Sequence, residues 1–459
     1  MESKLPKNWV ETEVGIISEI IRGITYNKLQ AKSIKKNDDY LVLRGGNIQD
    51  GKITTKTNDV VYVESNLVKE IQKIKKGDVV IVGSTGSKRL IGKAGIAKED
   101  FKEISFGAFL MLIRPSYLIN KTLFDYYFIS DNYRNVIREL AGGVNINNIR
   151  REYITNLNLP LPPLAEQQRI VAKLDTLFGS LDALKIRLNN IPQLIKNFKQ
   201  AVLTQAVTGK LTQEWRVGKE LEDALFNVDL NNYLTDIKYG TSKKSDYDID
   251  GMPILRIPNI KNGEIDTSDL KFSILDEKEY QKVLLKKGDI LIIRSNGSVS
   301  IVGKSAIIKN DKEFGYAGYL IRLRTSDNLN SKYLNYILSS PSLRKQIEEK
   351  ARSTSGVNNI NTTEIKELKI NVFDIKEQTE IVKRVENLFS KADAIEKQYK
   401  TLKEKIDRLP QAILAKAFKG ELVAQLPTDG DAKDLLEEIK KLKESLVVKP
   451  KKKVVRKKK

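Results

Sequence analysis

Two short loops carry side chains of the types that bind nucleic-acid bases and phosphates. Gly83–Arg89 follows an apolar run and presents hydroxyl groups and two cations, and Arg294–Ser298 lies at the equivalent place 211 positions later. Arg pairs with guanine and Asn with adenine at base edges, whereas Ser, Thr and Lys suit phosphates. The loops 141–148 and 352–359 have the same character. Loops rich in Gly, Asn and Ser are commonly plain turns, so it is their recurrence at matching places that favours contact with DNA.

These loops, with two Arg and Asn positions that recur in both halves of the chain, supply the candidate DNA-binding residues. The candidates are Arg44, Asn47, Ser84, Thr85, Ser87, Lys88, Arg89, Asn145, Arg256, Asn259, Arg294, Ser295, Asn296, Arg352 and Asn358. The equivalent tripeptides Gly83-Ser84-Thr85 and Arg294-Ser295-Asn296 differ. This difference predicts that the two loops contact different bases.

Catalytic chemistry finds little support in the sequence. The chain has no Cys and no His, which excludes disulfides, thiolate nucleophiles, Cys/His zinc sites and imidazole catalysis. Gly297–Ser305 resembles a phosphate-binding loop, but five residues separate its glycines where the motif needs four. There is no Asn-Pro-Pro-Tyr motif for a flipped adenine, and no carboxylate cluster has metal-site spacing. No catalytic or metal-binding residue is predicted; a self-contained methyltransferase or nuclease with an unrecognised site stays the alternative.

The formal charge of +21 points toward a polyanion, with nucleic acid before a membrane surface. Eight positive charges lie in the tail Lys449–Lys459, which we expect to be a disordered, solvated arm, and +13 remains for the rest of the chain. Without a run of roughly 18 apolar residues, the sequence predicts no membrane partner and a cytoplasmic protein. A basic scaffold that binds nucleic acid nonspecifically is a further alternative.

A duplication orders the chain. Glu166-Gln167 recurs as Glu377-Gln378, and the offset of 211 continues without a gap for 46 residues, 15 of them identical. The preceding segments repeat as well, since Lys75–Ile81 matches Lys286–Ile292 at the same offset. Both segments combine short strand patterns with helical ones. We therefore predict an α+β protein with a pseudo-twofold internal repeat, in the order globule, helix, globule, helix.

Two apolar stripes with heptad spacing follow the duplicated motif. In each copy apolar residues step alternately by four and three over 33 residues, which favours a coiled coil and corresponds to a rod of roughly 50 Å. We predict that the two copies pair antiparallel; helical bundles packed separately on their own domains are the alternative. Pro192 and Pro410 should kink or break the helices locally. The predicted interface residues are Ile170, Leu174, Leu177, Leu181, Leu184, Leu188, Ile381, Val385, Leu388, Ile395, Leu402 and Ile406.

The block Leu159–Val171, with its core Pro-Pro-x-x-Glu-Gln-x-x-Ile-Val, resembles the conserved region of specificity subunits of type I restriction-modification systems. The run Gly209–Thr212 and the second copy, Glu377–Val423, extend this resemblance, which covers the full chain in its order of parts. The second copy departs from the pattern, because Phe373–Lys376 stands where the Pro-Pro lead-in would be. The Lys/Arg tail is also outside the pattern.

The resemblance implies two target recognition domains that each read one half of an asymmetric, bipartite site in double-stranded DNA. It also implies two helical regions that pair as an antiparallel coiled coil, set the spacing and recruit two modification subunits. Those subunits would bring S-adenosylmethionine and methylate adenine, and two restriction subunits would join them and use ATP and Mg²⁺; the chain itself would hold no cofactor and catalyse nothing. The expected parts are recognition domains at 1–160 and 216–372, helical conserved regions at 161–215 and 373–445, and a basic tail at 446–459.

Overall fold

The computed structural model describes residues 5–36, 38–56, 60–142, 147–351 and 356–446 of the chain. The chain forms two compact units. Unit 1 comprises Met1–Ile186 with Leu402–Lys459, and unit 2 comprises Arg187–Thr401. Each unit therefore combines one globular half with parts of both helical segments.

The globular half of unit 1 is built on an antiparallel sheet of four strands. Its order is β2 (Ser18–Arg22), β11 (Leu110–Pro115), β7 (Val79–Val82) and β9 (Ala94–Ile96). The central strand β7 reads Val-Val-Ile-Val and is buried on both faces, which explains its unbroken apolar run. A smaller sheet has the order β10 (Ile104–Phe106), β3 (Tyr40–Leu43) and β6 (Tyr62–Val63). The helices α2 (Lys121–Phe128) and α3 (Asp131–Leu140) begin at the side-chain caps Asn120 and Ser130.

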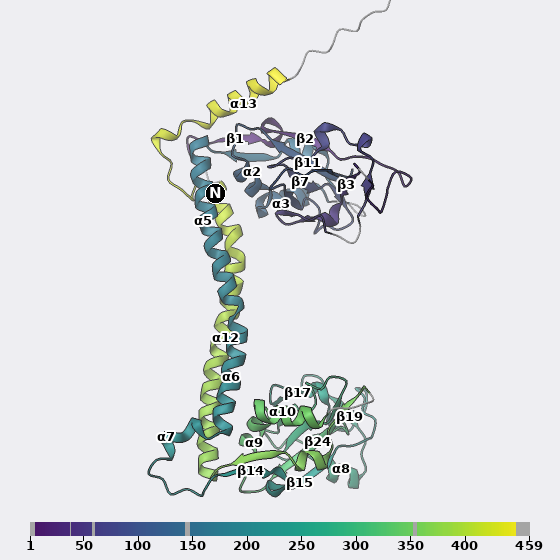
Figure 1. Cartoon of the computed structure of the whole chain (residues 1–459), viewed down its shortest axis with the longest axis vertical. Helices are drawn as coiled ribbons and strands as arrows, with labels where there is room; N and C mark the ends of the chain where they lie inside the picture. The colour runs from purple at the N-terminus through teal and green to yellow at the C-terminus, as the bar shows by residue number, and fades with distance from the viewer. Residues whose placement is uncertain (1–4, 37, 57–59, 143–146, 352–355, 447–459) are drawn as a thin grey trace, which may run out of the picture. The chain divides into compact units, whose positions relative to one another are not determined.

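Unit 2 repeats this architecture strand for strand. Its larger sheet has the order β15 (Leu234–Tyr239), β24 (Leu320–Thr325), β20 (Ile290–Ile293) and β22 (Ser305–Ile307). Its smaller sheet has the order β19 (Lys271–Ser273), β16 (Met252–Leu255) and β23 (Gly315–Tyr316). The helices α9 (Ser331–Leu338) and α10 (Pro341–Lys350) take the places of α2 and α3 (Figure 1). The matching strand orders confirm that the sequence duplication extends through the globular halves.

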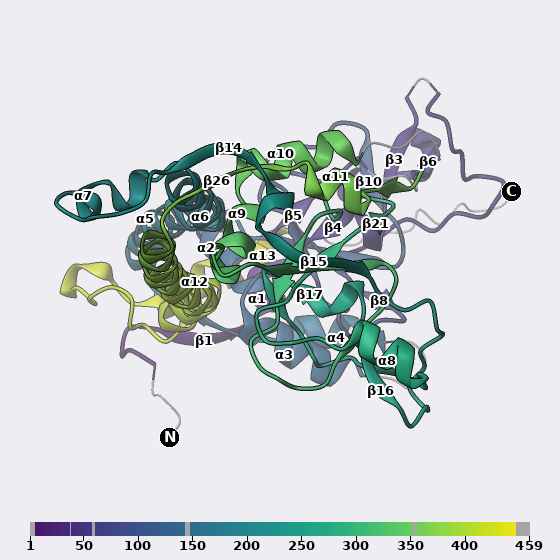
Figure 2. The same ribbon diagram turned by 90° about the horizontal axis from the view of Figure 1, so that it is seen from below.

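Three long helices carry the predicted heptads: α5 (Leu164–Asn189), α6 (Ile191–Val207) and α12 (Ile375–Phe418). In unit 1, Ile170 of α5 and Leu414 of α12 belong to one hydrophobic core. In unit 2, Val202 of α6 shares a core with Val385 of α12, and Figure 2 looks along these two helices. Of the two predicted breaks, the one at Pro192 occurs, since this residue lies in the first turn of α6. In contrast, α12 continues as a helix through Pro410.

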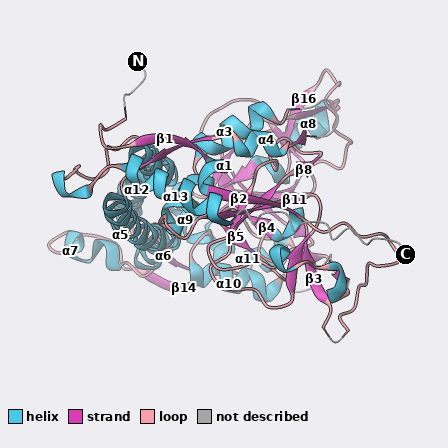
Figure 3. Cartoon of the chain, turned by 90° about the horizontal axis from the view of Figure 1, so that it is seen from above, coloured by secondary structure: helices cyan, strands magenta, loops and turns pink. Residues whose placement is uncertain are grey.

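The helix α13 (Ala432–Leu446) covers part of unit 1. Leu435, Leu436 and Ile439 enter the unit's core, and α13 contacts α1 (Val14–Ile17), next to which it is seen in Figure 3. The Lys443 ammonium donates to the Ser18 carbonyl at 3.2 Å. The basic tail that follows lies outside the described residues, so the prediction that it is disordered is not tested. Among the helices that are described, none is long and apolar enough to cross a membrane.

Candidate nucleic-acid interface

The structure brings the predicted loops together in pairs, one pair in each unit. In unit 1 the strand β8 (Ser84–Thr85) pairs with β12 (Asn147–Asn148). In unit 2 the strand β21 (Ser295–Asn296) pairs with β25 (Asn358–Asn359) in the same antiparallel register. Loops more than 60 residues apart in the sequence thus form one two-stranded ribbon per unit. Asn145 and Arg352 lie outside the described residues.

The ribbon of unit 2 holds a guanidinium group in a fixed position at its base. Arg294 stacks over the ring of Tyr239, with its Cζ 4.5 Å from the ring centre. Its Nε donates to Oδ1 of Asn359 on the neighbouring strand at 3.3 Å. The Tyr239 hydroxyl in turn accepts from the backbone N–H of Thr362 at 3.2 Å. A planar guanidinium oriented by stacking and by one hydrogen bond keeps further N–H donors for the paired acceptors of a base.

Several other candidates on the ribbons shape the turns themselves. The Asn296 side-chain oxygen accepts from the Ser298 backbone N–H at 3.0 Å, and Asn358 Nδ2 donates to the Gly297 carbonyl at 3.0 Å. In unit 1, Thr85 Oγ1 accepts from the Ser87 N–H at 3.2 Å. Ser84 and Ser295 are half-buried beside these turns, whereas Lys88 and Arg89 are exposed. The ribbons are therefore stiffened loops, with exposed cations near the tip in unit 1 and a guanidinium group at the base in unit 2.

Arg22 is a residue that the sequence comparison missed. On the sheet of unit 2, Tyr239 lies opposite Ile321; on that of unit 1, Arg22 lies opposite the equivalent residue Met111. Arg22 thus stands where Tyr239 stands, and Gly83 stands where Arg294 stands. Directly opposed residues point to the same face of a sheet, so Arg22 and Gly83 share a face as Tyr239 and Arg294 do. The sequence does hold a signal for this equivalence, because a glycine follows both the exposed Arg22 and Tyr239, namely Gly23 and Gly240.

Asn47 and Asn259 do not fit the predicted contact with DNA. Both are almost fully buried. Their side-chain oxygens accept from the backbone N–H groups of Arg44 and Arg256, each at 2.8 Å. Their side-chain amides donate to backbone carbonyls; the amide of Asn47, for example, donates to the Thr54 carbonyl at 2.9 Å. These side chains hold turns together, and Arg256 is itself paired with Asp269 at 3.1 Å.

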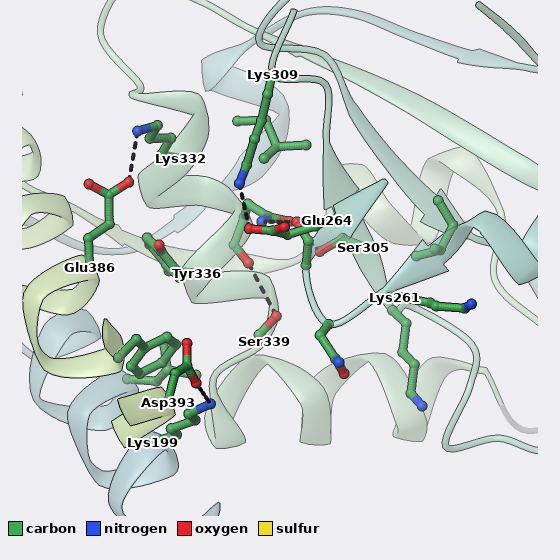
Figure 4. Close-up of a pocket in the computed structure, with 18 of the residues that line it drawn as sticks. Lys199, Lys261, Glu264, Ser305, Lys309, Lys332, Tyr336, Ser339, Glu386 and Asp393 are labelled. Carbon is green, nitrogen blue, oxygen red and sulfur yellow. Dashed lines mark hydrogen bonds and ion pairs between the residues drawn. The ribbon is translucent and has the colours of Figure 1, made fainter. Parts of the chain in front are cut away.

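Unit 2 also contains an open groove of about 1810 Å³ between its globular half and its helices. It is lined by α6, α12, α9 and the hairpin of β17 (Ile260–Lys261) and β18 (Glu264–Ile265). On its walls Lys199 pairs with Asp393 at 2.6 Å and Lys332 with Glu386 at 2.7 Å (Figure 4). None of the residues predicted to bind DNA lines this groove.

The floor of the groove is a closed hydrogen-bond network around Asn335. Its Oδ1 accepts from Ser305 Oγ at 2.8 Å, and its Nδ2 donates to the Gly263 carbonyl at 3.0 Å. In unit 1 the equivalent residue, also five positions after the helix cap, is Asp125. Burial raises the pKa of Asp125 to about 7, and its Oδ1 has no hydrogen-bond partner within the described residues.

Comparison with known proteins identifies the family. The sequence model described as "Type I restriction modification DNA specificity domain" matches residues 6–193 and 225–404, once for each half. The chain belongs to this family of type I DNA specificity subunits. The EcoKI specificity subunit of Escherichia coli is 40% identical over 447 residues, 95% of this chain and 96% of the relative. The StySPI specificity subunit of Salmonella potsdam is 40% identical over 424 residues, 92% of this chain and 91% of the relative.

The solved HsdS subunit from Thermoanaerobacter tengcongensis has the same fold, with a TM-score of 0.60 and 19% identity over 92% of this chain and 99% of that one. Membership in the family confirms the predicted role: the specificity subunit recognises DNA and is not itself an enzyme. The described residues contain no group of three or more acidic side chains that could hold a metal ion.

In the specificity subunit, the duplicated Glu-Gln motif joins each long helix to its recognition half. Gln167 accepts from the Asn120 N–H that precedes α2 at 2.8 Å and donates to the Pro162 carbonyl at 2.8 Å. Gln378 makes the same two contacts, with the Asn330 N–H at 2.8 Å and the Phe373 carbonyl at 2.7 Å. Because Phe373 performs the task of Pro162, the missing Pro-Pro lead-in leaves this junction intact.

The glutamates of the motif are buried beside these glutamines but have different partners. Glu166 accepts from Trp9 Nε1 at 2.9 Å and from Gln425 Nε2 at 3.0 Å. Glu377 accepts from the Thr212 hydroxyl at 2.7 Å and forms an ion pair with Arg216. The signal that marks the family in the sequence is therefore a structural junction.

Proposed function

We propose that this specificity subunit reads an asymmetric, bipartite site in double-stranded DNA, one half with each ribbon. The observation that carries the proposal is that the two ribbons have the same strand pairing but different side chains at their bases. Tyr239 and Arg294 in unit 2 correspond to Arg22 and Gly83 in unit 1. The two ribbons have the same backbone pairing but place different hydrogen-bond donors against the bases, so the two half-sites differ in sequence. The proposed recognition domains comprise residues 1–160 and 216–372.

The helices are proposed to pair as an antiparallel coiled coil that sets the distance between the half-sites. Two core contacts support this arrangement: the beginning of α5 with the end of α12 in unit 1, and the end of α6 with the beginning of α12 in unit 2. A helical segment of 33 residues is roughly 50 Å long, which exceeds the roughly 34–36 Å of one turn of DNA. Leu184, Ile395 and Leu402, predicted for the interface, are exposed.

These exposed positions are proposed to dock two modification subunits. In unit 2, Leu194 and Phe198 are one helical turn apart on α6 and expose large apolar side chains, as does Ile395 on α12. The modification subunits would supply S-adenosylmethionine and methylate adenine in each half-site. Restriction subunits that use ATP and Mg²⁺ would join the same complex, and a cytoplasmic location stays a prediction.

Co-expression with the modification subunits, followed by mapping of methylated adenines in the host genome, tests this function. We expect one motif with two different half-sites and a spacer of fixed length. Methyl transfer from labelled S-adenosylmethionine by the purified chain alone would instead make it a self-contained enzyme. Equal affinity for all DNA sequences in the assembled complex would leave only a nonspecific scaffold.

A further inference from the structure

The groove of unit 2 has a surplus of positive charge that the ribbons do not use. Each carboxylate that lines it forms an ion pair with a lysine: Glu264 with Lys309, Glu386 with Lys332, Asp393 with Lys199 and Glu396 with Lys400. Lys261 and Arg344 are paired as well, with Asp266 and Glu348. Lys196, Lys287 and Lys304 also line the groove, and among the described residues they form no ion pair. These three ammonium groups are available to an anionic ligand.

The lysines on the globular side of the groove recur in unit 1. Lys76 and Lys93 precede Lys287 and Lys304 by 211 positions. In unit 1, Lys93 is largely buried and forms an ion pair of 3.9 Å with Asp50, in the turn between β4 (Ile48–Gln49) and β5 (Lys52–Ile53), the hairpin equivalent to β17–β18. The residues at the bases of the ribbons differ between the halves, whereas these lysines do not. Their ligand must therefore present the same chemistry to both halves.

The floor of the groove offers little for reading bases. The amide of Asn335 is bonded at both ends, to Ser305 and to Gly263. Tyr336, labelled in Figure 4, also lines the groove and forms an aromatic pair with Phe389, with ring centres 5.8 Å apart. Flexible ammonium groups above such a floor suit a repeated point charge, which is what the phosphates of a nucleic-acid strand provide.

We propose that Lys287 and Lys304, with Lys196, bind backbone phosphates of the duplex whatever its base sequence, and that Lys76 does the same in unit 1. The proposal rests on the proposed function, since it assumes that DNA is the ligand of the recognition halves. In this arrangement the ribbons determine the sequence specificity, and the lysines supply an affinity that is common to all DNA. The other partner identical for both halves, a pair of modification subunits, is a separate outcome of the test.

The test compares Lys287→Ala/Lys304→Ala with the control Lys278→Ala/Lys312→Ala, which removes the same charge from exposed lysines outside the groove. Each variant is assembled with the modification subunits, and its affinity is measured against salt on a duplex with the mapped site and on one without it. The slope of log K against log salt is negative, and each lost phosphate contact makes it less steep by about 0.9, so we expect its steepness to fall by about 2 on both duplexes. The control should leave the slope unchanged, and Lys76→Ala in unit 1 should make it less steep by about 0.9.

An unchanged salt slope overturns the proposal, as does a loss confined to the duplex with the mapped site. Failure to co-elute with the modification subunits, with the salt slope kept, would assign the lysines to protein docking instead. The methylation motif of the groove variant separates this result from the proposed function. We expect an unchanged motif, whereas a complex without any sequence preference would refute the proposed function and leave the salt slopes interpretable.

Discussion

Each unit has an arginine in one equivalent pair of residues, but not at the same member of the pair. In unit 2 Arg294 projects from the end of the central strand and rests on Tyr239, 4.5 Å from the ring centre. In unit 1 the strand end is Gly83, and the arginine is Arg22, two strands away on the same sheet face. The side chain of Met111 lies against Gly83, 3.3 Å from where a Cβ would stand. The two halves thus aim an arginine from different origins.

This exchange predicts separable effects on the two half-sites. Arg294→Ala should change base preference only in the half-site of unit 2, and Arg22→Ala only in that of unit 1, each by about 1–3 kcal/mol. Mapping methylated adenines and measuring affinity on duplexes altered in one half-site checks both. Arg294→Lys is the matched control, because it keeps the charge but loses the planar fork. Equal loss at both half-sites would show a general effect on affinity or folding.

Asp125 predicts a pH dependence of stability that belongs to unit 1. Burial raises the pKa of Asp125 to about 7. The nearby charges of Lys98 and Lys121 lower this pKa, whereas that of Asp78 raises it. The proton is bound more tightly in the folded chain than in the unfolded one, where the pKa of Asp is about 3.9. The associated stability is present below about pH 4 and is lost as the pH rises to about 7.

Asp125→Asn imitates the protonated acid and the residue that unit 2 has at this place, Asn335. The variant should gain stability over the natural chain as the pH rises from about 4 to 7, by about 1.4 kcal/mol per pH unit at most, and by a constant amount above. Thermal unfolding of both proteins between pH 4.5 and 8 measures the difference. A difference that does not change with pH would contradict this assignment.

At the scale of elements, the junction between helix and recognition half depends on one carboxylate in each copy. Glu377 is buried between the Thr212 hydroxyl and the Arg216 guanidinium, whose pKa is raised chiefly by the hydrogen bond to Glu377. Among the described residues, the hydrogen-bond donors to Glu166 are uncharged groups of Trp9, Asn8 and Gln425. The residue at this motif position thus forms an ion pair in one unit and accepts hydrogen bonds from uncharged donors in the other.

Glu377→Ala should therefore destabilise unit 2 by roughly 2–4 kcal/mol, since it leaves a partly buried cation and a buried hydroxyl without their acceptor. Glu377→Gln should cost more than Glu166→Gln, because only the former loses a charged partner. Hydrogen exchange resolved by segment would locate each loss in α12 with β14 (Leu225–Asp229), or in α5 with β1 (Val10–Glu13). Equal costs for the two Gln variants would refute the difference in partners.

At the scale of the whole molecule, α12 is the helix that contributes to both units. Residues 375–401 belong to unit 2 and residues 402–418 to unit 1, whereas the first helical segment is interrupted at Asn190 between α5 and α6. If the paired helices act as a ruler, their length determines the spacer of the DNA site.

Removal of one heptad from 170–202, with a matching heptad from α12, should shorten the permitted spacer by about three base pairs. Seven helical residues span roughly 10.5 Å, and ten base pairs span roughly 34 Å. Methylated-adenine mapping of the shortened variant, with co-elution of the modification subunits as a check on assembly, gives the new spacing. A spacer of unchanged length would show that the helices do not set it.

The sequence by itself determined the duplication, the long helices, the absence of Cys and His chemistry and the family. These features depend on composition and on local periodicity, which are written along the chain and need no partner. Glu166 and Glu377 were thus visible as a repeat, and the heptads as helices, without knowledge of any contact. Asn47 and Asn259 had the right residue type for DNA, but nothing local shows that they turn inward to bind backbone groups.

The tertiary structure decided which of the polar residues stand together. Pairing of β8 with β12 and of β21 with β25 joins loops more than 60 residues apart, and strand register places Arg22 where unit 2 has Tyr239. It also gathers Lys196, Lys287 and Lys304 around one groove from segments far apart in the chain. Register and packing are set by contacts between distant segments, and a one-residue shift moves every side chain to the opposite face of a sheet. For that reason the repeat predicts two similar units, but only the folded chain shows which side chains lie together in each of them.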